Sequence, residues 1–223
     1  MENVGESFAA GIDKNTGENR WRIARPRGIN WVSPLVIQNN GRAEVLFQSG
    51  EGLDAYDVAT GKKLWNAPKL TSSAFASATT SDGVLFVHSA KFAAIRAGKT
   101  SDAKPEVLWE TPKLRLGYCS PVANQGLVYG VTNAGIVNCL DAKTGAVLWN
   151  HRLEGTFAAS PLLADGKLYV VNEKGVTTIL RAGRELEVIA TNPINDTILA
   201  SPVASDGAIF LRSDGALYCI GKK

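Results

Sequence analysis

Hydrophobic residues in this chain fall into short runs, and a turn containing glycine separates most of them. Residues 160–189 show the full pattern, with runs at 160–164, 167–172, 176–180 and 186–189. Runs of this length, rich in β-branched and aromatic residues, predict four antiparallel strands, which we denote A to D in chain order. We find no stretch of ten or more residues with apolar positions at helical spacing. The pattern therefore predicts an all-β fold.

The four-strand unit recurs along the chain. Its clearest marker is a tryptophan, which returns after 44, 44 and 40 residues at Trp21, Trp65, Trp109 and Trp149. Self-similarity at this period is typical of a β-propeller, in which each repeat is one blade. The units are a part-blade at 8–23, complete blades at 31–66, 75–110, 118–150 and 158–189, and a part-blade at 201–220. We therefore predict one propeller domain over residues 1–223, with about five blades.

Three of the four tryptophans end the same phrase, Asp-x-x-Thr-Gly-x-x-x-Trp. Its recurring positions are Asp13, Gly17 and Trp21, then Asp57, Gly61 and Trp65, then Asp141, Gly145 and Trp149. The Asp and Gly suit a tight C–D turn, because Asp accepts backbone hydrogen bonds and Gly tolerates positive φ. Each Trp, with Trp109, is predicted to spread over a neighbouring blade and to bury about 150–250 Å². In the Trp109 unit the polar segment 98–105 replaces the phrase, and we expect a mobile surface loop there.

A second phrase lies at the start of strand A. It is Ser-Pro at Ser33, Ser120, Ser160 and Ser201, and Ser-Ala at Ser77. Together with the segment from Ala55 to Trp65, these phrases resemble the pyrroloquinoline-quinone-like (PQQ-like) β-propeller repeats. That family includes quinoprotein alcohol dehydrogenases and the propeller lipoprotein of outer-membrane β-barrel assembly. The resemblance implies seven or eight blades, so we expect a segment of a larger propeller whose exposed blade edges allow self-association. It also implies a periplasmic or secreted protein.

Composition narrows the function classes. The chain is 45% hydrophobic and 20% charged, with a net charge of +3 carried by scattered residues, which gives nucleic-acid binding little support. No apolar run approaches the roughly 20 residues of a membrane-spanning helix, and the N-terminal residues do not resemble a signal peptide. We expect Cys119, Cys139 and Cys219 to be small buried thiols on strands, with a bridge between the first two left open. His88 and His151 are expected to be packed or surface residues.

One regularity predicts a binding site. Aromatic residues stand two positions before the Ser of strand A at Trp31, Phe75 and Tyr118, and Phe157 lies beside the equivalent Ala158. Arg25 and Arg27 precede Trp31, and Arg115 precedes Tyr118. Such rings and guanidinium groups can hold a protein segment or a small anionic or planar ligand. The alternative is that the rings only fill the neck of the propeller. The predicted mouth residues are Arg27, Trp31, Phe75, Arg115, Tyr118 and Phe157.

The chemistry of the chain favours binding over catalysis. No two cysteines are adjacent, and acidic residues such as Glu51, Asp54, Glu173 and Asp214 fall in predicted turns, where we expect them to be solvated. We predict no catalytic, cofactor-binding or metal-binding residues and expect no cofactor. Our first hypothesis is a non-catalytic binding or scaffolding propeller of the bacterial cell envelope. The alternative is a fragment of a PQQ-dependent alcohol or sugar dehydrogenase, which would use PQQ and Ca2+.

Overall fold

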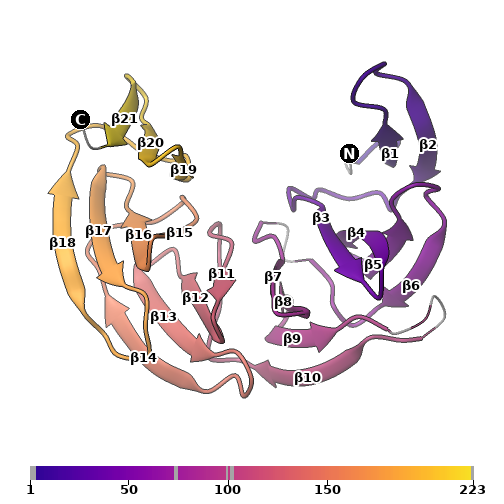
Figure 1. Ribbon diagram of the computed structural model, residues 1–223, viewed down its shortest axis with the longest axis horizontal. Coiled ribbons are helices and arrows are strands. Elements are labelled where there is room, and N and C mark those ends of the chain that lie inside the picture. The colour runs from indigo at the N-terminus through magenta and orange to yellow at the C-terminus, as the bar shows by residue number, and fades with distance from the viewer. Residues whose placement is uncertain (1–3, 73–74, 99, 101–102, 222–223) are drawn as a thin grey trace. The chain divides into compact units, whose positions relative to one another are not determined.

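The computed structural model describes residues 4–72, 75–98, 100 and 103–221. The described chain contains strands and no helix. It separates into two compact units, Met1–Pro112 and Lys113–Lys223. Each unit is built from small antiparallel sheets in which consecutive strands pair with one another (Figure 1). The prediction of an all-β propeller chain with four-stranded antiparallel blades is confirmed.

The first unit contains three sheets. A two-stranded sheet pairs β1 (Phe8–Ile12) with β2 (Asn19–Ala24). The first four-stranded sheet consists of β3 (Leu35–Asn39), β4 (Arg42–Ser49), β5 (Gly52–Asp57) and β6 (Lys63–Ala67). The second consists of β7 (Thr79–Ser81), β8 (Val84–His88), β9 (Phe92–Arg96) and β10 (Glu106–Thr111). In segment 98–105, which replaces the Asp-x-x-Thr-Gly phrase, residues 99, 101 and 102 lie outside the described residues.

The second unit also contains three sheets. The first consists of β11 (Val122–Asn124), β12 (Leu127–Val131), β13 (Ile136–Asp141) and β14 (Val147–Arg152). The next consists of β15 (Leu162–Ala164), β16 (Lys167–Val171), β17 (Val176–Arg181) and β18 (Val188–Pro193). The last has three strands, β19 (Val203–Ser205), β20 (Ala208–Arg212) and β21 (Leu217–Gly221). Strand β18 extends beyond Ile189 because residues 190–193 continue the ladder with β17.

The A–B turns explain why the hairpins are so regular. The described non-glycine residues with positive φ all begin such turns, with φ between 48° and 51°: Asn40, Asp82, Gln125, Asp165 and Asp206. The glycine that follows each of them also has positive φ, between 65° and 79°. Two consecutive positive φ values define the type I′ turn, whose twist matches that of the paired strands. The local sequence thus closes each A–B hairpin.

The C–D turns use the Asp-x-x-Thr-Gly phrase. The Oδ1 of Asp57 accepts hydrogen bonds from the backbone N–H of Ala59 (3.1 Å) and of Thr60 (2.8 Å). Asp13 and Asp141 accept the equivalent pairs of backbone bonds. The turn glycines, Gly17, Gly61 and Gly145, have φ between 70° and 77°. Hydrogen bonds from Thr60 are the main cause of a lowered pKa at Asp57, so this carboxylate is ionised at neutral pH.

Tryptophan side chains connect neighbouring sheets at two junctions. The indole Nε1 of Trp21, on β2, donates to the carbonyl of Val58 in the next sheet (2.8 Å), and its ring covers Gly61. Trp149, on β14, donates to the carbonyl of Gly183 in the sheet that follows (3.1 Å). Trp65 differs, because its Nε1 donates to the carboxylate of Glu44 in its own sheet (2.7 Å). The ring of Trp109 packs near the phenyl rings of its own sheet.

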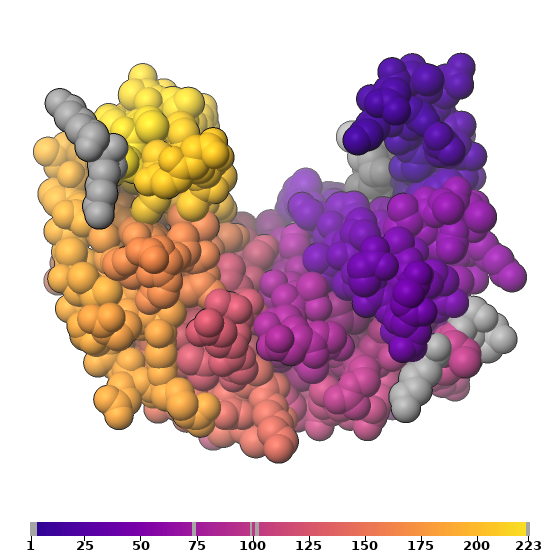
Figure 2. Space-filling view, in the orientation of Figure 1, coloured from indigo at the N-terminus to yellow at the C-terminus, as the bar shows by residue number. Residues whose placement is uncertain are grey.

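Apolar side chains fill the spaces between successive sheets within each unit. Figure 2 shows the outer surface of the same chain, coloured by residue number. In the first unit, Leu46 and Leu53 share a cluster with Leu85 and Ile95 of the following sheet. In the second unit, one cluster joins the sheets β11–β14 and β15–β18, and another joins β15–β18 to β19–β21. Burial of this apolar surface is the main favourable contribution to packing one sheet on the next.

The Ser of the strand A phrase makes a hydrogen bond between sheets. The backbone N–H of Ser33 donates to the hydroxyl of Ser77 (2.9 Å), 44 residues further along the chain. The same bond joins Ser120 to Ser160 (2.8 Å) and Ser160 to Ser201 (2.9 Å). A hydroxyl at this position therefore satisfies a backbone donor of the preceding sheet, which accounts for the recurrence of Ser.

The three cysteines are free thiols in different environments. Cys119, in the loop before β11, and Cys139, on β13, are fully buried, and burial raises the pKa of each thiol to about 12. Cys219 is exposed, so the expectation that all three are buried is wrong for this residue. It lies on β21, the outer strand of a three-stranded sheet, where no fourth strand of that sheet flanks it in the described chain.

Candidate functional site

Two aromatic rings, an exposed one of Trp31 and a half-buried one of Phe75, lie together in the first unit. The rings of Trp31 and Phe75 have their centroids 5.1 Å apart and are tilted by 31°. Trp31 is 63% exposed, although large aromatic side chains usually bury most of their surface. Ile29, close in sequence, is 59% exposed. We call Ile29, Trp31 and Phe75 the aromatic patch. It is the type of surface at which aromatic residues anchor a binding partner.

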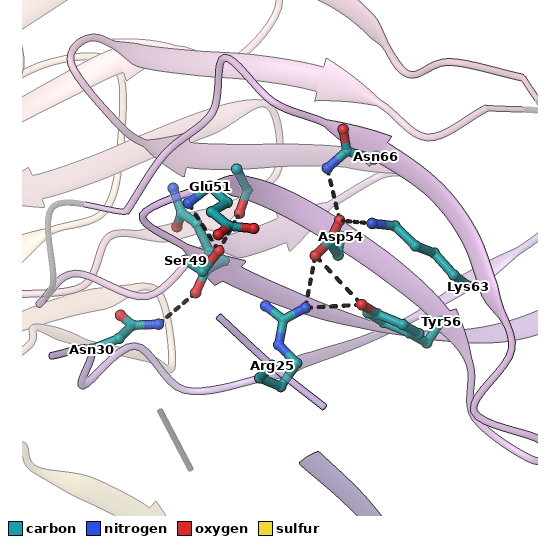
Figure 3. Close-up of polar contacts among 10 residues, drawn as sticks. Arg25, Asn30, Ser49, Glu51, Asp54, Tyr56, Lys63 and Asn66 are labelled. Atoms are coloured by element: carbon teal, nitrogen blue, oxygen red, sulfur yellow. Dashed lines mark hydrogen bonds and ion pairs between the residues drawn. The ribbon is translucent and has the colours of Figure 1, made fainter. Parts of the chain in front are cut away.

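The backbone around Trp31 is held firmly in place. The side chain of Asn30 donates to the carbonyl of Gln48 on β4 (2.6 Å) and accepts from the hydroxyl of Ser72 (3.0 Å). The Ser33–Ser77 hydrogen bond joins the two connections that carry the rings. Figure 3 shows Asn30 pointing towards β4. The aromatic patch is therefore presented on an ordered segment, which lowers the entropic cost of binding.

The other predicted mouth residues have different environments. Arg27 and Arg115 are exposed, and Tyr118, in the second unit, is 50% exposed. The backbone N–H of Tyr118 donates to the side chain of Asn133 (2.9 Å). Phe157 is only 1% exposed and packs in the core between two sheets, so it supports the fold and does not offer its ring to a ligand at the surface.

Arg25 is not part of an exposed basic site. Its guanidinium is buried, lies 2.7 Å from the carboxylate of Asp54 and donates to the hydroxyl of Tyr56 (2.9 Å) (Figure 3). The guanidinium also lies over the rings of Phe47 (5.2 Å) and Tyr56 (5.6 Å). Since Arg25 follows β2 and Asp54 lies on β5, the pair connects the first two sheets. The basic residue near Trp31 that remains exposed is Arg27.

The prediction that Asp54 is a solvated turn residue is wrong. It lies on β5, is 5% exposed, and also accepts from Lys63 (2.8 Å) and Asn66 (2.7 Å). Burial raises its pKa, but the hydrogen bonds from Lys63, Arg25 and Asn66 outweigh that effect and hold the pKa below its usual value. The carboxylate is therefore ionised and fully occupied by donors. Its burial depends on the pairing of β5 between β4 and β6, which a turn-like local sequence does not reveal.

The acidic side chains of the described residues are dispersed over the sheets. Within this part of the chain, no three His, Cys, Asp or Glu side chains are grouped where they could hold a metal ion. The carboxylate oxygens of Asp54 face cationic and amide donors, which leaves no room for a competing cation. The sequence also lacks the pair of adjacent cysteines found in quinone-dependent dehydrogenases of this family. We derive no catalytic step from this arrangement.

The repeated four-stranded sheets, their A–B turns and their inter-sheet contacts define a PQQ-like β-propeller. The family model described as outer membrane protein assembly factor BamB matches residues 8–105 and 98–185, so the chain belongs to this family. None of the curated protein sequences matches it. Among solved structures, the crystal structure of BamB from Moraxella catarrhalis is similar, with a TM-score of 0.75 and 17% sequence identity. The similarity covers 97% of this chain and 67% of that one.

At 17% identity, the similarity shows that the two proteins share a fold and carries no information about a shared partner. Within the described residues, the structure contains no helix long and apolar enough to cross a membrane. The sequence predicted Trp31, Phe75 and Tyr118 from their position before Ser. It missed Asn30, whose role depends on β4, eighteen residues away in the chain. An Asn directly before an exposed aromatic residue was the available signal.

Proposed function

We propose that this protein is a non-catalytic propeller module of the bacterial cell envelope that binds a protein partner through the aromatic patch. Two observations support the proposal. The chain belongs to a family named for an outer membrane protein assembly factor. Trp31 is exposed, packs on the half-buried Phe75 and follows Asn30, which is hydrogen-bonded to β4. The proposal rests mainly on the exposed Trp31 side chain. A partner would bury Trp31 as an anchor, and Arg27 would lie at the edge of the contact. Tyr118 and Arg115 remain predicted contacts in the second unit.

We propose a structural role for the tryptophans of the repeated Asp-x-x-Thr-Gly-x-x-x-Trp phrase. Trp21 and Trp149 contribute inter-sheet hydrogen bonds, and the ring of Trp21 also packs on the turn glycine Gly61 of the following sheet. We therefore assign the tryptophans that end the repeat phrase to docking of one blade on the next. Trp31 stands outside the phrase and is the tryptophan that is exposed among the described residues.

Site-specific photo-cross-linking in the host cell tests the proposal. A photoreactive phenylalanine analogue at position 31 should cross-link to an envelope protein, whereas the same analogue at the exposed position of Lys143 should not. With the partner identified, Trp31→Ala should weaken binding by about 2 kcal/mol, or roughly thirtyfold. Arg27→Ala should mainly slow association at low salt. Equal cross-linking from positions 31 and 143, or unchanged affinity of Trp31→Ala, would contradict the proposal.

A dye-linked assay addresses the enzymatic alternative. The protein incubated with PQQ and Ca2+ should not reduce the dye when alcohols or sugars are added, since the described residues provide no calcium site. Substrate-dependent dye reduction would replace the binding proposal with the dehydrogenase hypothesis. Cell fractionation tests the envelope location separately.

A further inference from the structure

The junction between the sheets β3–β6 and β7–β10 departs from the repeat. At two other junctions the indole of strand D donates to a backbone carbonyl of the following sheet. Here segment 98–105 replaces the Asp-x-x-Thr-Gly phrase, and Trp65 donates instead to Glu44 of its own sheet (2.7 Å). Glu44 is fully buried and also accepts from Arg42 and Asn39. The chain therefore keeps the tryptophan at this junction, Trp65, but the following sheet lacks the Asp-x-x-Thr-Gly turn.

A groove of about 540 Å³ opens at this junction. This volume is within the range of about 300–1,000 Å³ that is typical of ligand sites. Trp65 and Leu70 line it but are each only 4% exposed, and Pro68, Pro105 and Val107 supply its more accessible apolar surface. Val107 is 51% exposed although it lies on a strand. We call this site the β6–β10 groove.

The charges of the groove favour an acidic ligand. Lys69 and Lys104 line it, both are exposed, and neither has an acidic partner within 4.0 Å in the described part of the chain. The acidic residue of the lining, Glu110, lies 3.2 Å from the ammonium group of Lys91. The groove therefore combines an apolar lining with two lysines that have no acidic partner among the residues the structure describes.

One wall of the groove is an open sheet edge. In its sheet β10 is the outer strand and pairs only with β9 among the described strands. Its other edge offers backbone donors and acceptors to an added strand, which is a common mode of peptide recognition. A small ligand would not use this edge, whereas an extended peptide would use the edge, the apolar lining and the lysines together.

Two other grooves in the described part of the chain have a different origin. Those lined by Asn40 and Asp82, or by Asp165 and Asp206, lie between equivalent A–B turns of successive sheets. They recur because the turns recur, and their linings carry the acidic residues of those turns. The β6–β10 groove occurs instead where the repeat is interrupted, which is where a repeat protein adds a function to its scaffold.

We propose that the β6–β10 groove binds an extended segment of a partner protein in which apolar residues are flanked by Asp or Glu. The apolar side chains of the segment pack on the exposed Pro68 and Val107, and its carboxylates lie near Lys69 and Lys104. The backbone of the segment pairs with the open edge of β10. This site is separate from the aromatic patch and does not depend on it.

Fluorescence anisotropy with a labelled synthetic peptide, Gly-Asp-Leu-Phe-Asp-Leu-Glu-Gly, tests the proposal on the full chain. Saturable binding is expected, and it should weaken as salt is raised. Lys69→Glu combined with Lys104→Glu should lower the affinity at least about tenfold, because two attractions become repulsions. The matched control Lys143→Glu makes a single equivalent charge change at an exposed turn of the second unit and should have little effect. Circular dichroism verifies that each variant is folded.

Two further peptides separate the contributions. Replacing Leu and Phe by Ser should abolish binding, and replacing the acidic residues by Lys should do the same. The variant Trp31→Ala should leave the peptide affinity unchanged, which distinguishes this site from the proposed function. Absence of saturable binding, or equal affinity of the wild type and the double lysine variant, would overturn the proposal. Binding to phosphatidylglycerol vesicles through the same lysines, without peptide binding, would also overturn it.

Discussion

Gly61 provides a sharp test of how neighbouring sheets are joined. Its φ is +70°, and a Cβ at this position would lie 2.7 Å from Cδ2 of the Trp21 indole. Gly17 occupies the same place in its own C–D turn with φ of +77°, yet nothing lies within 4 Å of its Cβ position. The two glycines therefore share the same backbone requirement, and Gly61 alone is covered by a ring from the preceding sheet.

The expected costs follow from these two differences. Gly17→Ala places an L-residue in the left-handed region and should lower the free energy of unfolding by about 1–2 kcal/mol. Gly61→Ala carries the same backbone cost and a steric conflict with the indole, which adds about 1–3 kcal/mol. The total for Gly61→Ala is then about 2–5 kcal/mol. In a Trp21→Ala background the ring is absent, so Gly61→Ala should again cost only about 1–2 kcal/mol.

Urea unfolding monitored by circular dichroism measures these differences. The four proteins of the cycle are the wild type, Gly61→Ala, Trp21→Ala and the double variant, with Gly17→Ala as the matched control. Equal m-values would show that the same cooperative unit unfolds in each case. The reasoning is refuted if Gly61→Ala and Gly17→Ala cost the same, or if the coupling between positions 21 and 61 is near zero.

Three other predictions address buried and exposed groups. Asp54→Asn leaves the buried guanidinium of Arg25 without a counter-charge and should cost about 3–5 kcal/mol in urea unfolding. Because the pKa of Asp54 is lowered, the stability that its carboxylate contributes is present at neutral pH and is lost as pH falls below about 4. The Asp54→Asn variant should therefore lose part of the acid dependence of unfolding that the wild type shows. An unchanged dependence of stability on acid pH would contradict the assignment. Burial lowers the pKa of His88, so the unfolded chain binds the proton more readily than the folded one, and the free energy of unfolding should decline as pH falls below about 6.5. His88→Gln should reduce this pH dependence. A free energy of unfolding that rises as pH falls through this range would exclude our interpretation. A thiol reagent should modify Cys219 alone in the native protein and all three cysteines after denaturation, whereas rapid native modification of a second thiol would show that the core is open.

The strands and turns could be predicted from the sequence because their causes are local. A type I′ hairpin needs two consecutive residues that accept positive φ, and Asp165-Gly166 supplies them without help from distant residues. The turn of Asp57 likewise closes through residues two and three positions away. Repetition of these short-range signals about every 40 residues was sufficient to identify the fold class.

The candidate sites depended on contacts between sheets, which sequence spacing does not encode. Asp54 reads as a turn residue, yet the pairing of β5 and the approach of Arg25 make it a buried ion-pair partner. Phe157 was predicted as a mouth residue from its position before a strand A, and packing between two sheets buries it. Trp65 belongs to the repeat, but the indole bonds to its own sheet and lines a groove, because the turn of the next sheet is replaced.

The sequence by itself determined the strands, the turns and the repeat, since hydrogen bonds over two to five residues specify a hairpin wherever it lies in the protein. Only the tertiary structure decided which side chains are buried, paired or offered to a partner. The physical reason is that these properties arise where one sheet packs on the next, between residues such as Trp31 and Phe75 that are 44 positions apart.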